Sequence, residues 1–184
     1  MTRNRLATLL LGEGVVQHGD FILASGARSQ IYLDVKMGLV QPYILQSTAR
    51  EILRLCRGFD VVAGVAVGGV PLAVAVSLES MGTQYQPHGN IPYAIVRKDE
   101  KRHGLRGQVI GNVSGKRVLL VEDVTTTGNS ALLGVRALRE AGATVEEAIT
   151  VVLREQRAVT TLYTAGVNLR WLLTMEDLLG EATS

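Results

Sequence analysis

The sequence predicts an α/β domain in which a mostly parallel central sheet is flanked by helices. Apolar strand segments and amphipathic helical segments alternate through most of the chain, with short links between them. The segment VVAGVAV (61–67) is apolar at every position, as expected when both faces of a parallel strand are covered. At 184 residues, the chain is long enough for one domain, 1–184, and short for two.

The first third of the chain is predicted to hold two helices and two strands. MTRNRLATLLLGEGVV (1–16) has the pattern of an amphipathic helix. FILASG (21–26) and IYLDVK (31–36) are predicted to be short strands around a turn. Pro42 stands where a helix would begin, and YILQSTAREILRLC (43–56) continues with helical spacing.

Strand and helix then alternate to the end of the chain, except in the charged, glycine-punctuated segment 98–115, which we predict to be a loop. Strands are predicted at 61–67, 91–97, 116–123, 145–155 and 169–175, and helices at 72–82 and 129–143. The helix at 72–82 follows a GGVP turn and ends at a glycine.

The composition excludes several classes of protein. A net charge of +2 is too small to indicate nucleic-acid binding. The single cysteine, Cys56, excludes an intramolecular disulfide framework and lies in a helical pattern, which predicts an inert core thiol. The longest apolar run, 61–78, is divided by a glycine pair and Pro71, which favours core over membrane. Neither a membrane nor a nucleic-acid partner is expected, and the predicted location is the cytoplasm.

Three unusual segments follow three of the predicted strands: GGVP (68–71), RKDEKRHG (97–104) and EDVTTTGNS (122–130). Open α/β sheets bind ligands at the carboxyl ends of their strands. The sequence therefore predicts that these segments converge on one binding site.

The segment EDVTTTGNS predicts a site for a ribose 5-phosphate unit. Its Thr/Gly-rich loop leads into a helix N-terminus, which favours a phosphate. Glu122 and Asp123 repel each other, but vicinal sugar hydroxyls can donate to both and a divalent cation can neutralise them. The alternative is a capped turn with two solvated acids. Neither a P-loop nor a dinucleotide fingerprint is present in the sequence.

VLLVEDVTTTGNS (118–130) resembles the phosphoribosyl pyrophosphate (PRPP) motif of the type I phosphoribosyltransferases. Four other segments resemble parts of the orotate phosphoribosyltransferase family: FILASGARSQIYLDVK (21–36), GVAVGGVPLA (64–73), RKDEKRHG (97–104) and LREQRA (153–158). This resemblance implies a type I phosphoribosyltransferase-like fold. It also implies a small N-terminal hood region at about 1–40 and a catalytic loop at about 97–111.

The resemblance implies that ribose 5-phosphate passes from PRPP to N1 of orotate, releasing pyrophosphate, in de novo pyrimidine (UMP) biosynthesis. Mg²⁺ is the implied cofactor, held mainly by PRPP, and no direct protein ligand to the metal is predicted. The implied catalytic residues are Lys101, His103 and Asp123. The implied PRPP-binding residues are Arg97, Lys98, Lys101, His103, Glu122, Asp123, Val124, Thr125, Thr126, Thr127, Gly128, Asn129 and Ser130. Orotate would contact Ser25, Gly26, Thr126 and Arg154.

The loop RKDEKRHGLR (97–106) combines a basic excess with nearby glycines, so it could open for exchange and close over the reacting groups. The alternative for an isolated charge run is a solvated surface loop. By the resemblance, Lys98, Lys101 and His103 reach the site of a neighbouring subunit, which implies a homodimer.

Two positions depart from the family pattern, since Ala24 and Gly68 stand where lysines are often found. The N–H groups of Gly68 and Gly69 could partly compensate as an anion nest, and Arg28 could reach inward from the same turn as Ala24. Two other functions stay open: a phosphoribosyltransferase for another base, such as a purine in salvage, and a non-catalytic PRPP-sensing regulator. Arg154 argues against a neutral base, because it could pair with the orotate carboxylate.

Overall fold

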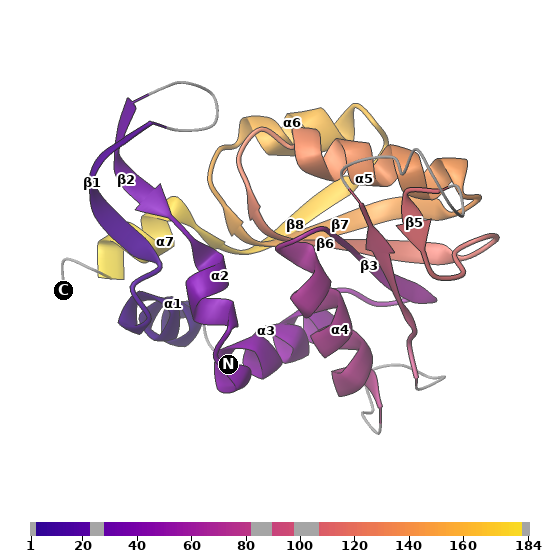
Figure 1. The fold of residues 1–184 in the computed structure, drawn as a ribbon, viewed down its shortest axis with the longest axis horizontal. Coiled ribbons are helices and arrows are strands. Elements are labelled where there is room, and N and C mark those ends of the chain that lie inside the picture. Colours follow the sequence, from indigo (N-terminus) through magenta and orange to yellow (C-terminus); the bar gives the residue numbers. More distant parts are fainter. Residues whose placement is uncertain (1–2, 23–27, 82–89, 98–106, 182–184) are drawn as a thin grey trace.

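A six-stranded sheet forms the centre of the molecule, and helices cover both of its faces (Figure 1). The structure is a computed structural model that describes residues 3–22, 28–81, 90–97 and 107–181. The sheet has the order β5-β4-β3-β6-β7-β8, and a separate two-stranded sheet holds β1 and β2. Every pairing in the large sheet is parallel except that of β4 with β5. The predicted α/β class is therefore confirmed.

The elements alternate along the chain. The strands are β1 (Val16–Ile22), β2 (Arg28–Leu33), β3 (Val61–Val65), β4 (Tyr93–Val96), β5 (Val109–Ile110), β6 (Arg117–Thr125), β7 (Thr144–Leu153) and β8 (Asn168–Thr174). The helices are α1 (Arg3–Gly12), α2 (Val35–Leu39), α3 (Pro42–Leu55), α4 (Gly69–Ser80), α5 (Asn129–Glu140), α6 (Arg157–Tyr163) and α7 (Met175–Glu181). Helices α5 and α6 cover one face of the sheet, and α1, α3 and α4 lie on the other side (Figure 1).

The central strands are apolar at successive positions because neighbouring side chains enter different cores. Leu119 and Val121 of β6 pack into the core that α1, α3 and α4 share with the sheet. Leu120, between them, packs into the core that α5 and α6 share with it. Side chains alternate between the two faces of a strand. When both faces are buried, the strand therefore lacks the alternation of apolar and polar residues that a half-exposed strand shows.

The region between the hairpin and α3 differs from the prediction. The strand predicted at 31–36 ends at Leu33 as β2, and a short helix, α2, takes over. Asp34 is the N-cap of that helix, because its Oδ1 accepts a hydrogen bond from the Lys36 N–H at 3.2 Å. Capping by aspartate ends the extended backbone where the alternating pattern alone suggests that it continues. Strand β1 also begins earlier than predicted, at Val16.

Short elements account for the other differences. Strand β5 lies in a segment that was predicted to be a loop. It consists of only two residues, which pair with β4. Helix α4 starts inside the predicted GGVP turn, and helices α6 and α7 were not predicted. Helix α7 carries a local signal: Thr174 Oγ1 accepts from the Asp177 N–H at 3.2 Å, and Asp177 Oδ2 accepts from the Thr174 N–H at 2.7 Å. This reciprocal pair has the form of a capping box.

Cys56 follows α3 and is fully buried, and burial raises the pKa of its thiol to about 12. Because the thiolate is the reactive species, we expect no reaction with a thiol reagent at pH 8 while the protein is folded. The measurement is the rate of labelling in buffer and in denaturant, where one thiol per chain should react. Rapid labelling of the native protein would contradict the buried position of this side chain.

Within the ranges that the structure describes, the helices are too short or too polar to cross a membrane.

Candidate active site

The carboxyl ends of three neighbouring strands bring the predicted segments together. Strand β3 pairs in parallel with β4 on one side and with β6 on the other. Their carboxyl ends therefore place Arg97, the turn at 66–68 and the segment 122–130 along one edge of the sheet. These residues therefore share the predicted sheet edge, whereas 98–104 lies outside the described residues, and a common binding site stays a prediction.

The turn between β3 and α4 is built for close approach of backbone to backbone. A Cβ on Gly64 would overlap the Gly69 carbonyl group, and a Cβ on Gly69 would overlap the Val121 carbonyl oxygen of β6. Glycine at both positions therefore lets the start of α4 lie directly against β3 and β6. This contact holds the N-terminus of a 12-residue helix beside the carboxyl end of β6.

Asp123 lies against this turn, and its carboxylate occupies the space where a side chain at Gly68 would begin. A Cβ on Gly68 would overlap the Asp123 carboxyl group. A lysine at position 68 would therefore displace the Asp123 carboxylate, which gives a physical reason for glycine at this position. Asp123 is partly exposed, with 13% of its side-chain surface accessible.

Lys36 reaches Asp123 from the other side and was not among the predicted site residues. Its Nζ lies 2.8 Å from Asp34 Oδ1 and 3.7 Å from Asp123 Oδ2. The hydrogen bond to Asp34 raises the pKa of Lys36; partial burial opposes this effect, and the charge of Asp123 adds to it. The ammonium group therefore stays charged at neutral pH. The sequence signal was the Asp34 cap, which turns the chain and aims Lys36 at the sheet edge.

Asp123 and Glu122 are adjacent in the sequence but differ in environment. Glu122 is buried, with 7% of its surface exposed, and stands opposite Thr150 of β7. Asp123 faces the turn and Lys36. Adjacent residues of a strand point to opposite faces, so the two carboxylates do not share one environment.

The Thr/Gly-rich loop leads from β6 into α5. Gly128 has a φ of +83° and is the N-cap of α5, and its missing Cβ leaves room for Ala158 and Thr161 of α6. The Asn129 N–H donates to Thr127 Oγ1 at 3.3 Å. Among the described residues, the buried Thr125 Oγ1 has no hydrogen-bond partner. The loop thus combines hydroxyl groups with the N-terminus of a long helix, which is the chemistry of a phosphate site.

Arg154 is tied directly to this loop. It follows β7, and its N–H donates to the Thr125 carbonyl oxygen at 2.9 Å. Strands β6 and β7 run in parallel up to the pair Thr125 and Leu153. The Arg154 side chain therefore leaves the backbone at the same sheet edge as Asp123 and the Thr/Gly-rich loop.

A family model for the phosphoribosyl transferase domain matches residues 44–165. An orotate phosphoribosyltransferase from Methanoculleus marisnigri is 50% identical over 176 residues, which cover 96% of this chain and 98% of the relative. The chain belongs to the orotate phosphoribosyltransferase family.

Solved structures of family members have the same fold. The Aeropyrum pernix orotate phosphoribosyltransferase superposes with a TM-score of 0.80 at 34% identity, covering 97% of this chain and 98% of that one. The Mycobacterium tuberculosis orotate phosphoribosyltransferase in complex with PRPP has a TM-score of 0.76 at 30% identity, covering 96% and 98%.

The remaining predicted site residues of this family member fall into two groups. Ser25, Gly26, Lys98, Lys101 and His103 lie outside the described residues, as does Ala24. Arg97 is described: its N–H donates to the Gln108 carbonyl oxygen at 2.8 Å, so these two residues of the predicted catalytic loop lie side by side. Arg28 is exposed at the start of β2.

Proposed function

We infer that this protein is an orotate phosphoribosyltransferase that forms orotidine 5′-monophosphate and pyrophosphate from orotate and PRPP. A bond forms between orotate N1 and ribose C1 while the bond from C1 to the pyrophosphate oxygen breaks, and the N1 proton is released. The observation that carries this proposal is Asp123, held by the β3–α4 turn beside a phosphate-type loop at the edge of the sheet. Its place is in the synthesis of UMP.

We propose that the segment 122–130 binds the ribose 5-phosphate of PRPP. Asp123 accepts from the ribose hydroxyls and residues 124–130 surround the phosphate. The buried Glu122, on the other face of β6, stays a predicted PRPP contact. The support is the turn at Gly128 and the N-terminus of α5, whose first N–H groups have no partner within the helix. Arg97 adds positive charge from the end of β4, and the predicted roles of Lys98, Lys101 and His103 complete the PRPP set.

The proposed role of Asp123 in the reaction is electrostatic. Breaking the bond to pyrophosphate leaves positive charge on the ribose and negative charge on the leaving group. A fixed carboxylate beside the ribose stabilises the first, and the cations Lys101 and His103 are proposed to stabilise the second. Asp123 needs little reorganisation because the turn at Gly68 already holds its carboxylate.

We propose Mg²⁺ as the cofactor, brought in by PRPP. The partly exposed Asp123 carboxylate adds negative charge at the sheet edge, which favours a cation held nearby by PRPP. When bound, the metal neutralises part of the pyrophosphate charge. That the protein supplies no direct ligand stays a prediction.

We propose that Arg154 binds the carboxylate of orotate, together with Ser25, Gly26 and Thr126. Arg154→Ala is expected to raise the KM for orotate about 10-fold or more, because a hydrogen bond to a charged group is lost. The KM for PRPP should change less than about 3-fold. Steady-state kinetics with each substrate varied in turn measures both constants. Arg136→Ala, at an exposed position of α5, is the matched control. An equal rise in both constants would contradict a role specific to orotate.

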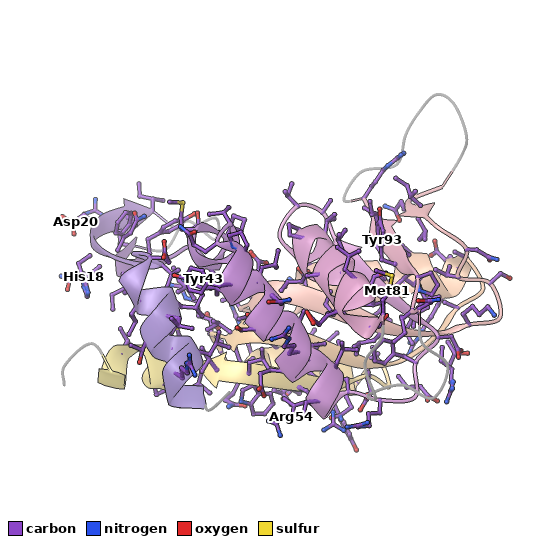
Figure 2. All side chains as sticks on the ribbon, turned by 90° about the horizontal axis from the view of Figure 1, so that it is seen from below. His18, Asp20, Tyr43, Arg54, Met81 and Tyr93 are labelled. Carbon is purple, nitrogen blue, oxygen red and sulfur yellow. The ribbon has the colours of Figure 1, made fainter. Side chains whose placement is uncertain are left out.

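The protein is proposed to act as a homodimer in which the catalytic loop serves the neighbouring site. The support is a set of exposed apolar side chains in or next to α2, α3, α4 and β4: Met37, Val40, Tyr43, Leu78, Met81 and Tyr93. Figure 2 views this side and labels Tyr43, Met81 and Tyr93. Single exposed apolar residues are common, but several on one side favour an interface.

Mixing two inactive variants tests the shared site. A dimer of Lys101→Ala with Asp123→Asn holds one site with both residues intact, so random mixing should restore about a quarter of the sites. No recovery after subunit exchange, with dimers present in light scattering, would place Lys101 in its own subunit's site. A monomer in light scattering would overturn the dimer itself.

Orotate consumption, followed by absorbance with PRPP and with or without Mg²⁺, tests the function. Adenine, hypoxanthine, xanthine and uracil serve as competing bases. PRPP-dependent loss of orotate alone supports the proposal, turnover of another base overturns the choice of orotate, and tight PRPP binding without turnover indicates a sensor.

A cytoplasmic location is part of the proposal and is supported by the single, buried cysteine.

A further inference from the structure

Lys36 has spare hydrogen-bonding capacity at the edge of the candidate site. Its ammonium group carries three N–H donors. Asp34 Oδ1 accepts one of them at 2.8 Å. The 3.7 Å separation from Asp123 Oδ2 is an ion-pair distance, longer than a hydrogen bond. Half of the Lys36 side-chain surface is accessible, so an incoming ligand can reach the free donors.

The N-terminus of α4 lies on the other side of Asp123 from this ammonium group. Asp123 lies between Lys36 and the backbone of Gly68, which leads into the N-terminus of α4. The N-terminus of a helix of this length favours negative charge. Lys36 and the N-terminus of α4 therefore lie near the same carboxylate, that of Asp123. In the proposed complex this carboxylate binds the ribose of PRPP, and the pyrophosphate group lies beside the ribose.

Asp34 holds the Lys36 side chain in place through their ion pair. The Asp34 N–H donates to the Val15 carbonyl oxygen at 2.8 Å, and its carboxylate caps α2. The anchor of the lysine is thus fixed to the backbone at two points. Ion pairs of an exposed lysine contribute little to stability, so we expect the Lys36 variants to fold.

We propose that Lys36 is a substrate-binding residue that donates to the pyrophosphate group of PRPP, exchanging its ion pair with Asp123 for that anion when Asp123 accepts from the ribose. This inference rests on the proposed PRPP site. Lys36 would then supply positive charge to the part of the site beside Gly68, which has no side chain of its own.

Calorimetric titration with three probes tests the assignment: PRPP, pyrophosphate with Mg²⁺, and ribose 5-phosphate. Lys36→Met removes the charge and keeps most of the stem, Lys36→Arg keeps the charge, and Lys116→Met is a control at the opposite end of β6. Lys36→Met should weaken PRPP and pyrophosphate binding about 10- to 100-fold. Ribose 5-phosphate binding should change less than about 2-fold, and Lys36→Arg should recover most of the loss.

Each other outcome overturns a distinct statement. Equal weakening of ribose 5-phosphate and PRPP would mean that Lys36 only positions Asp123, which overturns the pyrophosphate contact. Unchanged affinities for all three probes would overturn any role in binding. A wild-type protein that binds neither PRPP nor pyrophosphate would overturn the proposed function itself, together with the role of Lys36.

Discussion

Asp123→Asn is expected to lower kcat/KM for orotidine monophosphate formation by about 100-fold or more, the loss typical of removing one preorganised electrostatic group. Asparagine has nearly the same shape as aspartate, so it fits against Gly68, where the structure leaves no spare room. It lacks the negative charge that would stabilise the ribosyl cation, and it loses the ion pair with Lys36. Steady-state kinetics with PRPP and orotate measures the effect.

Asp60→Asn is the matched control for this change. Asp60 precedes β3 at the other end of the sheet, where its Oδ1 lies 3.5 Å from Arg117 and its Oδ2 accepts from the Arg117 N–H at 2.8 Å. Loss of this exposed pair should leave kcat/KM unchanged. Asp123→Asn with at least half of the wild-type kcat/KM would remove Asp123 from the mechanism.

Gly64→Ala is expected to lower both stability and activity. The added methyl group would overlap the Gly69 carbonyl, which is backbone and cannot rotate away. Overpacking of this kind costs about 1–3 kcal/mol in the free energy of unfolding. The start of α4 must move, and with it Gly68 and the Asp123 carboxylate, so kcat/KM should fall about 10-fold or more. Urea denaturation and steady-state kinetics measure the two effects.

Gly12→Ala is the control for the Gly64 variant. Gly12 ends α1, and a Cβ there would meet no atom within 4 Å. Alanine should leave activity unchanged and can raise the free energy of unfolding by about 0.4–1 kcal/mol. A Gly64→Ala protein that unfolds at the wild-type urea concentration would show that the β3–α4 contact is looser than the structure has it.

Local patterns in the sequence predicted most of the sheet because a strand that is buried on both faces is apolar at nearly every position. Strands β3, β4, β6, β7 and β8 all appear within a few residues of their predicted positions. The short elements were missed because two paired residues in β5, or a single capped turn in α2, carry too little periodic signal to outweigh their neighbours. Helix α7 shows that a local cap can mark a short helix.

The fold class, the strand ends at the candidate site and the acid–threonine–glycine loop could all be predicted from the sequence, because each depends on residues that are neighbours in the chain. How Asp123 is held depends on tertiary contacts. The contact with Gly68 depends on how closely α4 lies against β3 and β6, and the ion pair with Lys36 joins the hood to the sheet. Such contacts follow from the packing of elements distant in sequence, and no local pattern encodes their geometry.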